Sequence, residues 1–309
     1  LVGSEMCIRD SCYANLKRAI TGDAYIPARA GHVNGETRFV LDYFGMEEPK
    51  LVEDVRTQVK DIEIRKTRGV ADNISLKKAW NIMQENNVVT IPCVTEEGVL
   101  EGVITIGDIT KSYMNLYDSS IISKANTKYS NILDTLEGSM VVGDAEAYFD
   151  KGKVLIAAAN PDLMENYIEK HDLVILGNRY ESQLCAIEME AGCIIVCEGA
   201  GVSLTIRKLA QERGCTVITT PYDTYTTARL INQSMPISYF MTMENIIGFS
   251  DEDPIDDIRD IMANKRHRDF PILDSDGKYL GMISRRNLLG AKGCLLYTSP
   301  SPRDISGSR

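Results

Sequence analysis

Apolar and polar positions follow the same pattern in two stretches of the chain. In residues 79–109, apolar positions spaced three and four apart predict an amphipathic helix, followed by two short apolar strands on either side of a glycine turn. Residues 258–288 repeat this order without a gap, at a constant offset of 179. An ungapped internal match indicates that one supersecondary unit is used twice.

Paired positions strengthen the match between the two copies. Strands are expected at 91–94 and 102–105 in the first copy, with a second helix after them. The turns TEEG and DSDG place a glycine where a hairpin requires a positive φ. The paired residues are Pro92 with Pro271, Gly98 with Gly277, Gly102 with Gly281, Thr105 with Ser284, and Asp108 with Asn287.

Between the copies, residues 122–235 alternate between apolar runs and amphipathic segments. This alternation predicts a parallel α/β layer domain. The expected strands are KVLIAAAN, DLVILG, CIIVCEG and CTVITT, and the expected helices are DLMENYIEKH, ESQLCAIEMEAG, SLTIRKLAQERG and YDTYTTARLINQ. Gly199-Ala200-Gly201 follows a strand and opens a helix, which suits either a phosphate site or a plain turn; the absence of a third glycine and of a P-loop lysine favours the turn.

Composition narrows the choice of partners and compartment. With 34 Lys and Arg against 44 Asp and Glu, the net charge is −10, which argues against nucleic acid or an anionic membrane as the main partner. No apolar run reaches the roughly 20 residues of a membrane span. Eight cysteines, several within apolar runs, suit a reduced, cytoplasmic protein better than a disulfide scaffold. The pair in CIIVC is interpreted as part of a buried strand and not as half of a metal site.

The repeated unit resembles the CBS module, a β-α-β-β-α unit that works in pairs. The resemblance covers residues 60–118 and 236–293. It implies that the cleft between the modules binds adenine nucleotides (AMP, ADP, ATP or a diadenosine polyphosphate), with a Thr or Ser facing phosphate and an Asp three residues later holding the ribose. The positions that match are Thr105 and Asp108 in the first copy and Ser284 and Asn287 in the second. Asn287 lacks the charge of Asp, so this ribose contact is the weaker expectation.

Basic residues distinguish the second copy from the first. They precede its first strand and follow Ser284, where the first copy has no Lys or Arg at the equivalent positions. A solvated basic face remains an alternative, but the position beside the strand–helix junction favours a phosphate clamp. The cluster consists of Lys265, Arg266, His267, Arg268, Arg285 and Arg286.

The middle domain resembles the DRTGG domain in the stretch ILGNRYESQLCAIEMEAGCIIVCEG. The motif that names the family is altered here, because Gly177-Asn178-Arg179-Tyr180 stands where the family has Gly-Asp-Arg-Thr. The resemblance implies the fold, while any role for the motif itself is in doubt.

Residues 12–59 predict a helix, the strand YIPAR and a helix capped by Asn34. Gly31-His32-Val33-Asn34 begins like a metal-binding loop but lacks the Pro-Asp-x-Asp continuation, so His32 is interpreted as a turn residue. The three histidines fall in three different predicted domains, and no pair has ligand spacing. A two-metal site needs clustered imidazoles and carboxylates, so no catalytic or metal-ligating residue is assigned.

The order of these parts resembles the nucleotide-regulated branch of the DHH-type, family II inorganic pyrophosphatases. That resemblance implies hydrolysis of diphosphate to two phosphates with Mn2+ or Co2+, assisted by Mg2+, in the full-length protein. It further implies a homodimer with small-molecule nucleotides as its other partners. The chain itself is expected to be a fragment that holds mainly the regulatory insert; a stand-alone CBS/DRTGG nucleotide-binding or dimerisation module is the alternative.

The predicted fold is α/β and α+β: paired CBS modules flank a parallel α/β DRTGG domain, after the remnant of an α/β DHH domain. The two ends, LVGSEMCIRDS and CLLYTSPSPRDISGSR, share no periodicity with their neighbours and are interpreted as non-native sequence. The predicted division is 1–11 non-native, 12–59 partial DHH domain, 60–118 first CBS module, 122–235 DRTGG domain, 236–293 second CBS module and 294–309 non-native.

Overall fold

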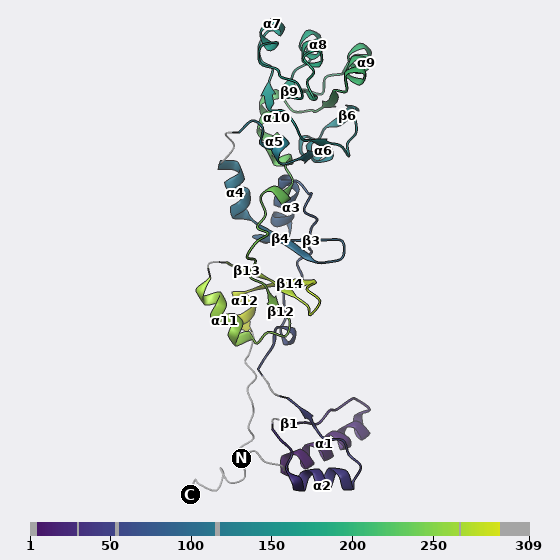
Figure 1. Ribbon diagram of the computed structural model, residues 1–309, viewed down its shortest axis with the longest axis vertical. Helices are drawn as coiled ribbons and strands as arrows, with labels where there is room; N and C mark the ends of the chain where they lie inside the picture. Colours follow the sequence, from purple (N-terminus) through teal and green to yellow (C-terminus); the bar gives the residue numbers. More distant parts are fainter. Residues whose placement is uncertain (1–4, 30, 53–55, 115–117, 266, 291–309) are drawn as a thin grey trace. The chain divides into compact units, whose positions relative to one another are not determined.

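The structure is a computed structural model that describes residues 5–29, 31–52, 56–114, 118–265 and 267–290 (Figure 1). Arg266, one of the predicted basic residues, lies outside these ranges, as do 1–4 and the whole of the predicted tail 294–309. The chain divides into two compact units. The first unit comprises 1–63, 252–266 and 285–309, and the second comprises 64–251 and 267–284.

The predicted repeat is present, and the first helix and the two hairpin strands of each copy keep the offset of 179 residue by residue. The first copy contains α3 (Leu76–Glu85), β3 (Thr90–Val94), β4 (Leu100–Thr105) and α4 (Ile106–Met114). The second contains β12 (Phe249–Ser250), α11 (Ile255–Asn264), β13 (Asp269–Leu273), β14 (Tyr279–Ser284) and α12 (Arg285–Gly290). Gly98 (φ +85°) and Gly277 (φ +78°) have the positive φ that the turn pattern predicts.

Within the second unit, the segment that leads into each copy pairs with the last strand of the other copy. Arg65 and Met282 of β14 exchange two backbone hydrogen bonds (3.0 and 2.9 Å), and Thr242 and Val103 of β4 do the same (3.0 and 2.9 Å). Met282 and Val103 are equivalent positions in the repeat. The two leading segments are therefore exchanged between the copies. A further bridge pairs Val99 with its own equivalent, Lys278, which indicates a local pseudo-twofold relation between the two hairpins.

The close crossing of these segments explains the paired glycines. A Cβ on Gly281 would lie 2.9 Å from the carbonyl oxygen of Arg65, and one on Gly102 would lie 2.8 Å from Sδ of Met241. Real Cβ atoms do not approach a backbone oxygen as closely as 2.9 Å, so Gly281 is needed for the crossing at Arg65. At Gly102 a side chain would instead require the flexible Met241 side chain to move.

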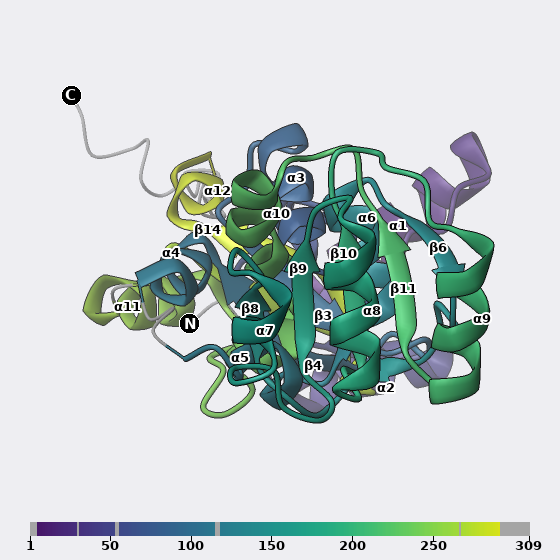
Figure 2. The same cartoon turned by 90° about the horizontal axis from the view of Figure 1, so that it is seen from above.

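The middle domain forms a five-stranded sheet with the order β6-β11-β10-β9-β8. Four strands are parallel, as predicted, while β6 pairs with β11 in the antiparallel direction and adds an edge that we did not predict. The strands are β6 (Ser139–Val142), β8 (Val154–Ile156), β9 (Leu173–Leu176), β10 (Cys193–Val196) and β11 (Thr216–Thr219). Figure 2 shows α7 (Pro161–Met164), α8 (Tyr180–Glu188) and α9 (Leu204–Arg213) side by side over one face.

Alternate residues of the central strands enter two different hydrophobic cores. Val174 of β9 and Ile194 of β10 belong to the core beneath α7, α8 and α9. Ile175 and Ile195, their neighbours, point to the opposite face and share one core with α3 of the first copy and with α6 (Tyr129–Leu136). One hydrophobic core therefore serves both the first copy and the middle domain.

Several elements differ from the sequence-based expectation. Residues 118–150, for which we predicted no individual elements, contain α5 (Ile121–Lys124), β5 (Thr127–Lys128), α6 and β7 (Tyr148–Phe149). The helix expected at 162–171 ends at Met164, because the chain then turns into β9 with His171 at φ +72°. The helix expected at 222–233 is α10 (Thr224–Leu230) continued by the 3₁₀ turn η2 (Ile231–Ser234). A second 3₁₀ turn, η3 (Ile237–Tyr239), follows.

The first unit contains the predicted N-terminal helices. Asn34 caps α2 (Gly35–Tyr43), and its Oδ1 accepts a hydrogen bond from the Thr37 N–H (2.8 Å), as predicted. The strand expected in YIPAR is only β1 (Ala28–Arg29), paired with β2 (Lys50–Leu51). α1 (Glu5–Thr21) begins inside the segment 1–11 that we had excluded, and the 3₁₀ turn η1 (Val59–Asp61) precedes the boundary of the unit.

We expect Gly281→Ala to destabilise the protein, because the new Cβ would press against the Arg65 carbonyl. Overpacking of this kind costs about 2 kcal/mol of unfolding free energy, which urea denaturation would reveal as a lower midpoint. Gly177→Ala is the matched control, since nothing lies within 4 Å of the Cβ it would add. Equal midpoints for the two variants would contradict the close crossing.

The buried thiols should resist alkylation in the folded protein. Burial raises the pKa of Cys93 and of Cys215 to about 12, so both remain protonated near pH 7.5. Iodoacetamide at that pH should modify the exposed Cys12 and reach Cys93 and Cys215 only after denaturation. Peptide mass spectrometry checks this, and modification of folded Cys215 at the rate of Cys12 would disprove it.

Candidate nucleotide-binding junctions

At the first junction, where β4 meets α4, the two predicted ligand residues are hydrogen-bonded to each other. The Asp108 carboxylate oxygen Oδ2 accepts from the Thr105 backbone N–H (3.0 Å) and hydroxyl (2.7 Å). The Asp108 N–H in turn donates to the Thr105 hydroxyl (3.3 Å). This reciprocal arrangement is a capping box that starts α4. The other carboxylate oxygen, Oδ1, takes no part in these hydrogen bonds.

The second junction begins at the end of β14, in the second unit. Ser284 is the last residue of β14 and lies opposite Asp269, the first residue of β13. His267 and Arg268 immediately precede β13 and are exposed. The His267 ring packs edge-on against Phe270, with 6.1 Å between the ring centroids. The second unit thus brings Ser284 and Asp269 onto neighbouring strands at one end of the hairpin.

The remaining predicted basic residues belong to the first unit, on α11 and α12. Arg285 uses its Nη2 atom to donate to the carbonyl oxygens of Met262 (2.6 Å) and Lys265 (3.0 Å). Those carbonyls end α11, so Arg285 acts as a side-chain cap for that helix. Asn287 donates from Nδ2 to the Glu63 carbonyl (3.2 Å). The prediction that Arg285 grips phosphate therefore competes with a structural role that the sequence did not reveal, while Arg286 is exposed.

Sequence analysis missed two charged residues at the second junction. Arg65 forms an ion pair with Asp269, whose side chain is only 5% exposed. Next to this pair, the Tyr279 hydroxyl donates to the Thr67 carbonyl (2.9 Å), and burial raises the pKa of Tyr279. Arg65 precedes the repeat, so no periodic pattern identified it. Asp269 could have been noticed only by comparing the copies, because the equivalent residue of the first copy, Thr90, is uncharged.

The glycine turn after β10 has the structure of a plain strand-to-helix connection. The N–H groups of Glu198 and Gly199 donate to the carbonyls of Tyr222 and Thr220 (both 2.8 Å). The Ser203 hydroxyl caps α9 by accepting from the Ile206 N–H (3.3 Å). These donors already have partners, which supports the turn interpretation over a phosphate cradle.

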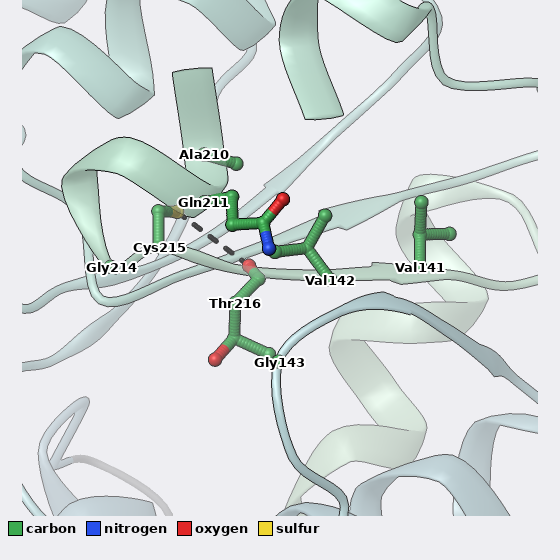
Figure 3. A pocket seen from close by; sticks show the side chains of 8 residues that line it. All are labelled: Val141, Val142, Gly143, Ala210, Gln211, Gly214, Cys215 and Thr216. Carbon is green, nitrogen blue, oxygen red and sulfur yellow. Dashed lines mark hydrogen bonds between the residues drawn. The ribbon is translucent and has the colours of Figure 1, made fainter. Parts of the chain in front are cut away.

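A cavity of about 440 Å3 lies between α9 and the strands β6 and β11 (Figure 3). Its walls include Gln211, Cys215 and Thr216, and the Cys215 thiol donates to the Thr216 carbonyl (3.6 Å). None of the predicted nucleotide-binding residues lines it. The cavity has no charged side chain in its lining, so it offers no group that would bind phosphate.

No metal centre can be built from the part of the chain that the structure describes, because nowhere in it do three or more His, Cys, Asp or Glu residues gather as ligands. The residues in hand thus do not fit the two-metal site implied by the pyrophosphatase resemblance, and no chemical step is assigned to a metal here. Within the same residues, no helix has the length and apolar character needed to cross a membrane.

Comparison with known proteins agrees with both domain resemblances. The CBS domain model matches residues 59–115 and 238–293, and the DRTGG domain model matches residues 131–234. The chain is also similar to a solved structure of the CBS and DRTGG domains of the regulatory region of Clostridium perfringens pyrophosphatase, with 36% sequence identity and a TM-score of 0.71. The match covers 74% of this chain and the whole length of that structure. The chain belongs to this family of pyrophosphatase regulatory regions. The paired-CBS and DRTGG fold predicted from the sequence is thereby confirmed.

Two pyrophosphatases are similar to this chain over most of its length. It is 38% identical over 277 residues to a cobalt-dependent inorganic pyrophosphatase of Clostridium perfringens, and 27% identical over 278 residues to a probable manganese-dependent inorganic pyrophosphatase of Thermotoga maritima. Each match covers 90% of this chain and 50% of the relative. The chain therefore spans about half the length of these relatives.

The capping role of Arg285 leads to a stability prediction. Arg285→Ala should lower the unfolding free energy by about 1 kcal/mol, because two terminal carbonyls of α11 lose a charged donor. Arg286→Ala, one residue away and exposed, is the control and should leave stability unchanged. Chemical denaturation of both variants decides the matter; equal stability would show that the Arg285 contacts contribute nothing.

Proposed function

We propose that this chain is an adenine-nucleotide-sensing regulatory region of an inorganic pyrophosphatase. The observation that carries the proposal is the whole-length structural match to a regulatory region whose structure was determined with an activator, diadenosine tetraphosphate. Two strand–helix junctions, related by the exchange of leading segments, supply the residues that the CBS resemblance assigns to a nucleotide. The parent protein would hydrolyse diphosphate with Mn2+ or Co2+ bound in the half that this chain does not represent.

The two junctions would hold different parts of a nucleotide. The first would supply Asp108 Oδ1 for a ribose hydroxyl. The Thr105 hydroxyl donates its proton to Asp108 Oδ2 in this structure, so it would turn from the carboxylate to a phosphate oxygen on binding. For the second, the second unit would supply Ser284, His267 and Arg268. The CBS resemblance also assigns Asn287, Lys265, Arg285 and Arg286, which belong to the first unit. Cationic forks bind phosphate oxygens strongly. AMP, ADP, ATP and diadenosine polyphosphates differ in phosphate number, so they would stabilise different arrangements of the regulatory region and thereby alter activity.

The protein would act as a homodimer. Diadenosine tetraphosphate has two equivalent adenosine ends, and a ligand with twofold symmetry suits a site built from two copies of one surface. The second unit also exposes a cluster suited to an interface, in which the Arg229 guanidinium lies over the Tyr225 ring (5.7 Å to the centroid). The cytoplasm is the proposed compartment, supported by the free, buried thiols of Cys93, Cys193, Cys197 and Cys215.

Calorimetry with AMP and with diadenosine tetraphosphate tests the proposal. We expect saturable binding of both, and Arg286→Ala should weaken binding of the tetraphosphate about tenfold, the effect of one hydrogen bond to a charged group. Arg286 is preferred to Arg285 for this purpose because its loss does not uncap α11.

Arg259→Ala on α11 is the matched control, since Arg259 pairs with Asp256 on the exposed face of that helix. Its affinity should equal that of the unaltered protein. Failure of the unaltered protein to bind AMP or diadenosine tetraphosphate at millimolar concentration would remove the sensor function and leave a dimerisation scaffold.

A further inference from the structure

The segment leading into the first copy places an arginine beside the strands of the second. Arg65 exchanges two backbone hydrogen bonds with Met282, and side chains on one face of a strand recur at every second residue. Arg65, Met282 and Ser284 therefore share a face. Asp269 lies opposite Ser284 on β13 and shares it too. Three polar side chains thus gather at the end of β14 where the candidate phosphate site begins.

The guanidinium of Arg65 is only partly engaged there. Its Nη2 atom donates to Asp269 Oδ1, while 37% of its side chain remains exposed. Its Nε–H is buried without a hydrogen-bond partner among the described residues, and the same holds for the Thr67 hydroxyl oxygen two residues later. Buried donors and acceptors in folded proteins nearly always have a hydrogen-bond partner. The Arg65 Nε–H and the Thr67 hydroxyl are therefore two polar groups that a ligand could pair.

The first junction has no such pair. Thr90 and Thr105 occupy the places of Asp269 and Ser284, and Thr242 takes the place of Arg65 beside the equivalent strand. All three are uncharged. Besides the basic residues that flank the second copy, the two junctions thus differ by one Arg–Asp ion pair, which places two opposite charges directly on the strands of the second junction.

We propose that Arg65 is the specificity-determining residue of the second junction, which selects ligands with a chain of phosphates. Its guanidinium is shared between Asp269 and a ligand phosphate, and a polyphosphate draws it away from the carboxylate. A phosphate chain carries more charge than one carboxylate and offers the paired oxygens that a guanidinium fork prefers. This inference rests on the proposed nucleotide-sensing function and deepens it.

The position of Arg65 also gives the binding event a route to the first copy. Five residues later the same segment pairs with β3: the Val70 N–H donates to the Pro92 carbonyl (3.0 Å), and the Val94 N–H donates to the Val70 carbonyl (2.9 Å). Movement of Arg65 toward a ligand therefore acts on a segment attached to both hairpins. The first copy shares its core with the middle domain, so the displacement reaches that domain as well.

Asp269→Asn is the decisive variant, because it keeps the shape of the side chain and removes the competitor for the guanidinium. We expect diadenosine tetraphosphate to bind at least about fivefold more tightly, since the freed arginine can pair fully with phosphate, and AMP to change less. Asp257→Asn changes the net charge by the same amount on an exposed ion pair with Arg56 and is the matched control.

A second variant asks whether Arg65 itself carries the gain. Arg65→Met alone would leave the Asp269 carboxylate buried and unpaired, so it is made in the Asp269→Asn protein, and circular dichroism verifies folding. The double variant should bind the tetraphosphate at least about tenfold more weakly than Asp269→Asn alone. Arg65→Lys in the same background keeps the charge without the fork and should lie between them.

The outcomes separate the two proposals. If the unaltered protein binds neither nucleotide, the proposed function fails, and the role of Arg65 fails with it. If it binds both and Asp269→Asn leaves the tetraphosphate affinity unchanged or lower, Arg65 is a structural residue only, and the sensor function stands. A gain shared equally by Asp257→Asn would reduce the effect to net charge and overturn the specific role of Arg65.

Discussion

Backbone hydrogen bonding between each repeat and the leading segment of the other is the constraint on which the second unit depends. β4 and β14 each have one edge whose N–H and C=O groups their own hairpin does not satisfy. Thr242 and Arg65 complete those edges with the same pair of hydrogen bonds. An unpaired strand edge is both unstable and prone to aggregate. Each hairpin therefore gains two backbone hydrogen bonds from the segment that precedes the other copy, which ties the two copies together.

The same exchange leaves little room for a side chain at two glycines. Gly102 and Gly281 lie directly under the crossing segments, and both remain glycine although much of the surrounding sequence differs between the copies. The backbones of the two copies therefore remain equivalent at the two places where a leading segment crosses a strand. Side-chain symmetry is free to break elsewhere, and it breaks most strongly at the junctions, where one copy has three threonines and the other has Arg65, Asp269 and Ser284.

The middle domain is joined to the first copy by packing as well as by the chain. One face of its sheet lies under α8 and α9, while the other shares a hydrophobic core with α3. Polar contacts reinforce the connection, since the Lys77 ammonium donates to the Thr135 carbonyl (2.9 Å) and the Asn131 amide donates to the Asn73 carbonyl (2.9 Å). Close-packed cores have low compressibility and transmit strain. The middle domain is thus built to move together with the first copy.

The sequence by itself determined the repeat, its offset, the glycine turns, the α/β character of the middle domain and the helix cap at Asn34. All of these depend on local periodicity or on a backbone requirement of single residues, and both are visible along the chain. The sequence also indicated that Thr105 and Asp108 lie close together, because residues three apart at the start of a helix are neighbours in space. Their role in binding a nucleotide stays a prediction, as do the roles of the other assigned site residues.

Only the tertiary structure decided which segment completes which strand, and with it the charge of each junction. Arg65 and Asp269 are 204 residues apart in sequence, and no periodicity relates them. The antiparallel β6 and the core shared by two predicted domains were hidden for the same reason, because pairing across long separations depends on which edges remain unsatisfied. The sequence predicts Arg285 as a phosphate ligand, while the structure shows its guanidinium donating to the carbonyls at the end of α11. Sequence identifies the groups that carry charge, and the fold decides what each of them faces.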